Sequence, residues 1–150
     1  SFVELLHENR QKPILVTGTG FCAPLQEFMV RKLLVLGYCA IGSNSYEVYE
    51  SGALNAGLVI AISKSGKTNT ILKPVQDSFA QHRSIIAFVG ADNSPIARCA
   101  DPAFVLLDDK MLDDRNLTAN YFYARVLITF EYLMDLVLEK DEHPNGKEGQ

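Results

Sequence analysis

The sequence predicts an α/β fold, a three-layer sandwich around a five-stranded parallel sheet of the flavodoxin-like, doubly wound kind. Short apolar runs rich in Val and Ile alternate along the chain with longer segments of helical period. These runs are apolar throughout, which is typical of strands that are covered on both faces, as in parallel sheets. The 150 residues, of which 47% are hydrophobic, suffice for one domain with a sizeable core.

The elements follow in order along the chain. The predicted strands are 13–17, 38–41, 58–62, 84–89 and 103–107. A first helix contains His7, and further helices are predicted at 23–36, 46–56, 69–81, 95–100 and 117–140. In the helix over 23–36, Pro24 suits the first position and Gly37 suits the exit.

The last predicted helix has too many apolar residues for a single stripe. We therefore expect it to bury one face against the sheet and a second face against a partner subunit. The polar residues after it predict a disordered tail over 141–150, so that one domain occupies 1–140.

Charge and composition exclude several classes of protein. The net charge is −4 and the basic residues are scattered, which argues against this domain binding nucleic acid by itself. No apolar run approaches the roughly 20 residues that span a bilayer, and no signal peptide opens the sequence. Because the sequence begins at Ser1 rather than Met, we expect it to be a piece of a longer protein.

The cysteines favour a reducing compartment. There are 3 of them and no CxxC pair, so neither a disulfide framework nor a zinc site is expected. We expect Cys39 and Cys99 to be small buried hydrophobic residues. The sequence indicates a cytoplasmic protein with neither a metal nor another cofactor.

In a doubly wound fold, ligands bind at the carboxyl ends of the strands, near the point where the strand order reverses. The loops at those ends are predicted at 18–24, 42–46, 63–68 and 90–95, and each is rich in small and polar residues. These four loops are therefore the candidate site.

The first loop carries Gly18-x-Gly20-x-x-Ala23, a relaxed form of the dinucleotide-binding fingerprint. The match is weak, since the second strand ends in IGSNS, without the acid that would hold a ribose or the arginine that would hold its phosphate. Two other interpretations stay open: the glycines only permit a tight turn, or the backbone amides of the loop face another anion.

The third loop, SKSGKT, falls one residue short of a nucleotide-binding P-loop. That motif requires glycine where Ala61 stands, and an apolar strand that continues to Ser63 leaves too short a loop to wrap a triphosphate. The same residues allow another interpretation. Ser65 and Thr68 join Ser63 around Gly66, immediately before a predicted helix.

The start of a helix offers free N–H groups and a partial positive charge. Hydroxyls can bond the same anion, and glycine lets the backbone approach it closely. We therefore interpret the loop as a site for one phosphate group, with Thr68 also capping the helix. Two lysines either add charge or remain solvated, namely Lys64 and Lys67. The alternative is a plain turn that happens to contain serines.

Together with NSPIARCAD further on, these motifs resemble the sugar isomerase (SIS) domain, a five-stranded parallel α/β sandwich that binds phosphorylated sugars. Its signature Ser-x-Ser-Gly-x-Thr after the third strand is matched by Ser63, Ser65, Gly66 and Thr68. Its Gly-x-Gly-x-Ser after the first strand is matched by Gly18 and Gly20, and its segment after the fourth strand by Ser94, Pro95, Ile96, Ala97, Ala100 and Asp101. The resemblance covers roughly residues 5–140.

Within that family the chain looks most like the C-terminal effector domain of RpiR-type transcription regulators. In those proteins a helix-turn-helix domain precedes the SIS domain, and a sugar phosphate tunes DNA binding. The opening residues, SFVELLHENRQKPILVTGTG, resemble the helix that enters the effector domain. The resemblance implies a homodimer or higher oligomer that contacts DNA only through a domain outside this sequence.

Three positions depart from the family pattern. Cys22 stands where a phosphate-binding serine is usual, and a thiol is a weaker hydrogen-bond donor. Gly57 replaces the aspartate that introduces the third strand, and Thr70 stands where many members place an acid.

The sequence offers no convincing acid/base pair for isomerisation, which needs a positioned base. We expect the histidines to be solvated: His7, His82 and His143. Charged groups that could face the site, or only favour a helix start, are Glu47, Glu50, Asp113, Asp114 and Arg115. The sequence thus favours a sensor, with a sugar-phosphate isomerase acting on aldoses and ketoses as the alternative.

In the expected site, the phosphate contacts Ser63, Ser65, Thr68 and nearby amides, and the Gly18–Cys22 loop lies opposite. The sugar hydroxyls meet Ser43, Asn44 and Glu47. Ligand binding shifts the last helix and its dimer, which alters the spacing of the attached DNA-binding domains. Such a shift requires that the ligand bind two arrangements with different affinity.

Overall fold

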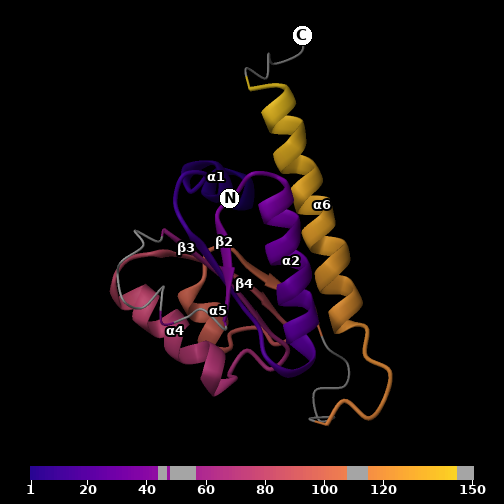
Figure 1. Ribbon diagram of the computed structural model, residues 1–150. Coiled ribbons are helices and arrows are strands. Elements are labelled where there is room, and N and C mark those ends of the chain that lie inside the picture. Colours follow the sequence, from indigo (N-terminus) through magenta and orange to yellow (C-terminus); the bar gives the residue numbers. More distant parts are fainter. Residues whose placement is uncertain (44–46, 48–56, 108–114, 145–150) are drawn as a thin grey trace.

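The computed structural model describes residues 1–43, 47, 57–107 and 115–144. Five parallel strands form one sheet there, in the order β2-β1-β3-β4-β5 (Figure 1). The strands are β1 (Ile14–Thr17), β2 (Ala40–Gly42), β3 (Leu58–Ser63), β4 (Ser84–Val89) and β5 (Ala103–Val105). The predicted parallel α/β fold is confirmed, with strand boundaries within two residues of those expected.

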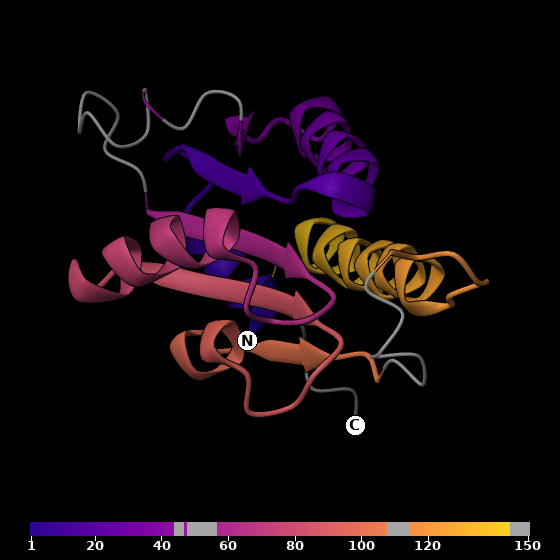
Figure 2. The same ribbon diagram turned by 90° about the horizontal axis from the view of Figure 1, so that it is seen from below.

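Helices cover both faces of the sheet, which makes three layers (Figures 1 and 2). One face carries α1 (Phe2–Glu8), α2 (Ala23–Val35) and α6 (Phe122–Glu142). The other face carries α4 (Asn69–Ala80) and α5 (Pro95–Cys99). The short 3₁₀ helix η1 (Gly20–Cys22) leads into α2. The helix predicted over 46–56 lies outside the described residues, apart from Glu47.

The domain has two hydrophobic cores, one on each face of the sheet, because side chains alternate between the faces along each strand. In β3, Leu58, Ile60 and Ile62 pack with α1, α2 and α6, while Val59 and Ala61 pack with α4 and α5. Every residue of β3 is buried, because both faces of this central strand are covered. This is the physical reason for the continuous apolar runs in the sequence.

The last helix differs from its predicted range at both ends. It begins at Phe122 rather than near 117, with Tyr121 at the N-cap position, and the Asn120 side chain accepts a hydrogen bond from the Phe122 amide at 2.8 Å. It continues to Glu142, so Asp141 and Glu142 are helical rather than part of a disordered tail. Residues 145–150 of that predicted tail lie outside the described residues.

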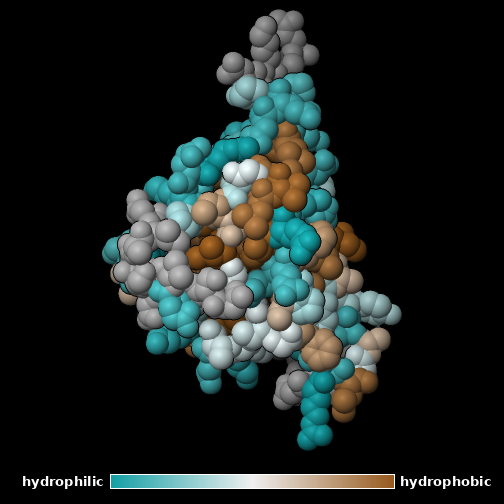
Figure 3. All heavy atoms as spheres, in the orientation of Figure 1, coloured by the Kyte–Doolittle hydropathy of each residue, from teal (hydrophilic) through white to brown (hydrophobic). Residues whose placement is uncertain are grey.

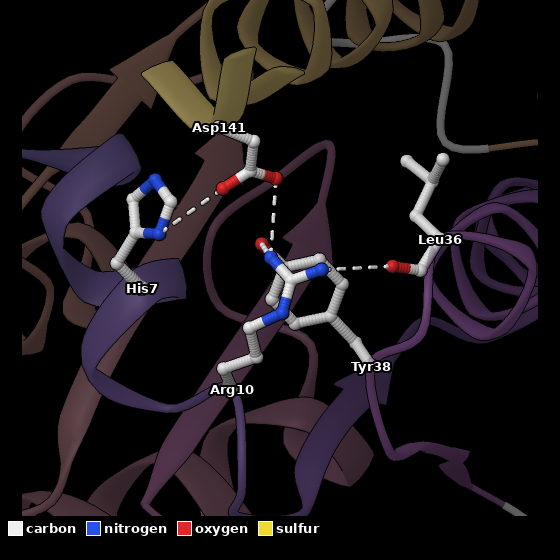
Figure 4. A network of polar contacts seen from close by, with 5 residues as sticks. All are labelled: His7, Arg10, Leu36, Tyr38 and Asp141. Atoms are coloured by element: carbon white, nitrogen blue, oxygen red, sulfur yellow. Dashed lines mark hydrogen bonds and ion pairs between the residues drawn. The ribbon is translucent and has the colours of Figure 1, made fainter. Parts of the chain in front are cut away.

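A polar network holds the end of α6 against the rest of the domain (Figure 4). Arg10 donates to the Asp141 carboxylate at 3.1 Å and to the Leu36 carbonyl at 3.4 Å, and its guanidinium lies over the Tyr38 ring. The His7 Nδ1 atom lies 3.5 Å from the same carboxylate, and its Nε2 atom is buried. His7 is therefore half-buried rather than fully solvated as expected, because the end of α6 lies beside it.

The cysteines also differ from expectation. Cys22 is buried, Cys99 is half-buried and Cys39 is exposed. Cys39 immediately precedes the edge strand β2, and its neighbours Tyr38 and Ala40 take the buried positions, so the alternation leaves its thiol outside. Among the helices of the described residues, none is long and apolar enough to cross a membrane.

Candidate functional site

The candidate site lies where the strand order reverses. From β1 the chain passes to β2 on one side and later to β3 on the other, so the loops after β1 and β3 leave neighbouring strands in opposite directions. Figure 2 shows these loops together at the carboxyl ends of the strands, with the segment before α6 beside them. The structure thus brings together the first and third of the four loops that the sequence analysis named.

Hydroxyl groups organise the loop between β3 and α4. The Ser63 hydroxyl accepts a hydrogen bond from the Gly66 amide at 3.0 Å and lies 2.9 Å from the Thr68 hydroxyl. The Ser65 hydroxyl accepts from the Lys67 amide at 3.3 Å and lies 3.5 Å from Thr68. Since Ser63 is only 1% exposed, its hydroxyl supports the loop from beneath, while Ser65 and Thr68 are half-buried above it.

Thr68 occupies the N-cap position of α4, but its side chain makes no capping hydrogen bond. The predicted capping role was therefore wrong. The hydroxyl points instead toward the two serines of the loop, which leaves the first amides of α4 without a side-chain cap. No acidic residue lies in the first turn of this helix either.

The helix α5 supports this loop from behind. The Gly66 carbonyl accepts a hydrogen bond from the Ile96 amide at 2.9 Å. Gly66 has a φ of +70°, and a Cβ atom built there would lie 2.1 Å from the Ser94 hydroxyl. Ser94 in turn accepts from the Ala97 amide at 3.4 Å and caps α5. The NSPIARCAD motif therefore fixes the shape of the SKSGKT loop.

The loop after β1 lies opposite. The Thr19 and Thr70 hydroxyls, one from each side, are 3.3 Å apart. Gly18 permits a close approach of the backbone, because a Cβ atom there would lie 2.8 Å from the Cys22 carbonyl oxygen. Gly20 has a φ of +58° and starts η1.

Cys22 is buried between the two loops rather than open to solvent. Burial raises the pKa of its thiol to about 11, and a hydrogen bond from the Lys64 backbone together with the Lys64 charge opposes part of that rise. The thiol is neutral at ordinary pH and joins the two loops.

The predicted contacts to the sugar are placed only in part. The Ser43 hydroxyl lies 2.9 Å from the Thr17 hydroxyl and accepts from the Gly18 amide at 3.2 Å, so it belongs to the base of the first loop. Gln26 shares this network, since its side-chain oxygen accepts from the Gly18 amide at 3.0 Å. Asn44 lies outside the described residues, and Glu47 is described only as exposed.

A groove of about 630 Å³ opens beside this network, between α2 and the end of β2. Its lining includes Gln26 and Ser43 at one side and Glu27, Val30, Arg31 and Leu34 along α2. The position of Gln26 in the first turn of α2, which follows the glycine loop, is the sequence signal that could have revealed its role.

The segment before α6, where the sequence analysis named Arg115 but not Asn116, lies beside the loops. The Lys64 ammonium donates to the Asn116 side-chain oxygen at 3.3 Å, and the Tyr123 hydroxyl donates to the same oxygen at 2.7 Å. The Tyr123 ring lies 5.9 Å from the ring of Phe21. Lys64 is thus held by a partner, whereas Lys67 is exposed.

The remaining candidates are exposed or lie outside the described residues. His82 and His143 are exposed, as expected. Arg115 is also exposed, and Glu50, Asp113 and Asp114 lie outside the described residues. The two facing loops, 18–22 and 63–68, contain hydroxyls, amides and lysines, and they contain no carboxylate and no imidazole. Such a set can bind an anion but cannot by itself move a proton between carbon atoms.

No family model and no curated protein matches this sequence. Solved structures do match it. The NanR protein of Vibrio vulnificus, complexed with ManNAc-6P, is 20% identical with a TM-score of 0.76, over 92% of this chain and 52% of that one. The sugar isomerase domain of an RpiR transcription factor from Sphaerobacter thermophilus is 16% identical with a TM-score of 0.62, over 95% and 86% of the two chains.

A protein from Methanococcus jannaschii, with an inferred function of 3-hexulose-6-phosphate isomerase, is 20% identical with a TM-score of 0.71, over 94% and 78% of the two chains. These likenesses show that the chain has the fold of the sugar isomerase domains, as the resemblance in its motifs implied. The chain spans about half the length of NanR.

Proposed function

We propose that this domain binds a sugar phosphate and serves as the sensing part of an RpiR-type transcription regulator. One observation carries the proposal: the hydroxyls of Ser65 and Thr68 and the uncapped start of α4 face the loop after β1 across the Thr19–Thr70 contact. The arrangement offers hydrogen-bond donors and a positive helix end to one small anion.

The described contacts assign different tasks to the residues of this site. Ser65, Thr68 and the first amides of α4 donate to the phosphate, while buried Ser63 keeps Gly66 and Thr68 in place. Gly20 and Cys22 shape the opposite loop. The sugar extends toward Ser43 and Gln26, where Asn44 and Glu47 of the neighbouring segment add polar contacts.

Two observations favour a sensor over an enzyme. The facing loops carry no acid/base pair. Two of the similar structures are NanR, complexed with ManNAc-6P, and an RpiR transcription factor. The alternative is an isomerase that interconverts aldose and ketose phosphates, which the likeness to the Methanococcus jannaschii protein supports.

A regulator of this kind works in the cytoplasm as a homodimer. Its DNA-binding domain precedes the present sequence, so that the ligand acts on DNA through the spacing of the two subunits. The ligand drives this only by the difference between its affinities for the two arrangements.

The test is ligand-induced thermal stabilisation with a panel of hexose, amino-sugar and pentose phosphates. A ligand present at 100 times its Kd adds about 2.7 kcal/mol to the free energy of unfolding, which raises the Tm of a domain of this size by about 5–10 °C. In Ser65→Val we expect that increase to vanish while the domain remains folded, because the methyl groups exclude the phosphate.

The matched control is Ser84→Val, a half-buried serine at the start of β4, at the opposite edge of the sheet. It should keep the full increase. An unchanged increase in Ser65→Val would contradict the site. Conversion of any ligand of the panel into its isomer, followed by NMR, would favour the enzyme over the sensor.

A further inference from the structure

We propose that Asn116 is a positioning residue: it holds the Lys64 ammonium toward the phosphate and links the candidate site to the first turn of α6. The inference rests on the proposed function, since it concerns the same anion. It assigns a role to Asn116, which the sequence analysis did not single out, next to Arg115, which it named as a candidate.

Three distances define the link. The Lys64 ammonium donates to the Asn116 side-chain oxygen at 3.3 Å, and the Tyr123 hydroxyl donates to that oxygen at 2.7 Å. The rings of Tyr123 and Phe21 lie 5.9 Å apart, so the loop after β1 contacts the same tyrosine. One carbonyl oxygen has two lone pairs and can accept both hydrogen bonds.

The backbone of Asn116 is a second, independent observation. Its φ is +53°, in the left-handed region that residues with a Cβ atom seldom occupy. Asparagine tolerates this region better than most residues do. This backbone conformation sets the direction in which the Asn116 side chain leaves the chain, toward Lys64 and Tyr123.

Lys64 is fixed at its backbone as well. Its carbonyl accepts a hydrogen bond from the Gly90 amide at 3.0 Å, and its own amide bonds the Cys22 thiol. The start of the side chain is thus set by β4 and by the opposite loop, and its end by Asn116. An ammonium has three donors, so Lys64 can keep Asn116 and still donate to a phosphate oxygen.

The link has a consequence for α6. Tyr123 is the second residue of that helix, so the group that orients the lysine also lies in the helix that we expect at the subunit interface. A phosphate that orders Lys64 therefore also favours one position of the first turn of α6. Through this contact, ligand binding would change the position of α6 at the expected subunit interface.

The experiment measures the affinity of the folded domain for inorganic phosphate and for glucose 6-phosphate by calorimetry. Asn116→Gly removes the side chain and accepts the left-handed backbone, and we expect it to weaken binding about tenfold. Lys64→Met should weaken binding at least as much. Because Asn116 acts through Lys64, the double variant should bind no more weakly than Lys64→Met alone.

A second variant keeps the test sound if Asn116→Gly does not fold. Tyr123→Phe keeps the ring and removes only the hydroxyl that bonds Asn116, and it should weaken binding about threefold. Its matched control is Tyr121→Phe, which removes the hydroxyl of an exposed tyrosine just before α6 and should leave binding unchanged.

The pH profile distinguishes positioning of a charge from general damage. A phosphate ester gains its second negative charge near pH 6, so the affinity of the unmodified domain should rise between pH 5 and pH 7. That rise should be reduced to the same extent in Lys64→Met and Asn116→Gly.

The outcomes separate this inference from the proposed function. If the unmodified domain binds neither probe, both are wrong. If it binds them and Ser65→Val does not, the phosphate site stands. In that case, unchanged binding in Asn116→Gly and Tyr123→Phe, or strictly additive losses in the double variant, would overturn the role of Asn116.

Discussion

At the scale of single residues, the candidate site depends on side chains that are almost completely buried. Ser63 and Cys22 are 1% and 6% exposed. Ser63 holds its own loop together through Gly66 and Thr68, and Cys22 joins the loop after β1 to the backbone of Lys64. Both positions match or replace phosphate-binding serines of the family pattern. In this structure they shape the loops, and we therefore propose that half-buried Ser65 and Thr68 make the direct contacts to a ligand.

Cys22 leads to a prediction about pH. Burial raises the pKa of its thiol from an ordinary value of 9.0 to about 11 in the folded state. The unfolded chain therefore loses this proton at lower pH than the folded chain, and the stabilisation, complete below pH 9, is lost as the pH rises through 11. Between pH 9 and pH 11 we expect ionisation of this thiol to lower the free energy of unfolding by about 2 kcal/mol.

The measurement is urea unfolding of the unmodified domain and of Cys22→Ala between pH 8 and pH 11. The alanine variant should lose less stability across the window, because it has no thiol to ionise. Cys39→Ala is the matched control, since that thiol is exposed and its removal should leave the pH dependence unchanged. Parallel curves for the Cys22→Ala variant and the unmodified domain would contradict the prediction.

At the scale of elements, the decisive contact joins the β3–α4 loop to α5. The Gly66 carbonyl is bonded to the Ile96 amide, and the Ser94 side chain fills the space in which a Cβ atom of residue 66 would lie. The loop can thus take its shape only because a helix that begins 29 residues later packs behind it.

We expect Gly66→Ala to lower the free energy of unfolding by about 2–4 kcal/mol. The new Cβ atom would lie 2.1 Å from the Ser94 hydroxyl, and the backbone at φ +70° disfavours any side chain. Chemical denaturation measures the loss. The control is Gly20→Ala, where φ is +58° but no atom lies within 4 Å, so that only the backbone strain of about 1 kcal/mol applies.

If Gly66→Ala and Gly20→Ala lower the free energy of unfolding equally, α5 does not constrain the loop. The comparison also concerns function, since a displaced Gly66 would move Ser65 and Thr68 together. Phosphate binding should therefore decline more in Gly66→Ala than in Gly20→Ala.

At the scale of the whole molecule, α2 and α6 leave apolar surface uncovered in the described part of the chain. Figure 3 shows apolar side chains gathered over α2 and beside α6. On α6, Ile128 and Tyr132 are 70% and 63% exposed, one turn apart on a face that also carries Arg125 and Asp135. Exposed apolar surface of this kind is typical of a protein interface.

We infer that a second copy of the chain covers this face, because the charges on it are self-complementary. If two α6 helices pack antiparallel about a two-fold axis near residue 130, Ile128 of each copy meets Tyr132 of the other. The same register sets Arg125 of each copy against Asp135 of the other. Like charges do not meet at these positions.

We predict a dimer whose dissociation constant depends on the charges of Arg125 and Asp135. Arg125→Asp should weaken the dimer at least tenfold by setting two acids against each other, and Arg125→Asp with Asp135→Arg should restore it. Sedimentation equilibrium measures the dissociation constant. Phe79→Glu, at a phenylalanine of α4 that is 56% exposed, is the control and should leave it unchanged. If the unmodified domain stays monomeric at 100 µM, the proposed interface is wrong.

Much of the site could be predicted because local chemistry carries it. The sequence SKSGKT contains the hydroxyls, the glycine and the helix start together, and the strand before it ends at Ser63 as expected. Other parts could not be predicted. Nothing near Asn116 indicates that its oxygen accepts from Lys64, 52 positions away, and nothing near Thr68 indicates that its hydroxyl turns away from its own helix.

The sequence by itself determined the order of strands and helices, the parallel sheet and the edge where the loops gather. These features follow from periodicity and burial, which are local properties repeated along the chain. Only the tertiary structure decided which side chains meet: His7 with Asp141, Gly66 with Ser94, Lys64 with Asn116. Such contacts depend on how separate elements pack in space, and no pattern within one segment records the packing of another.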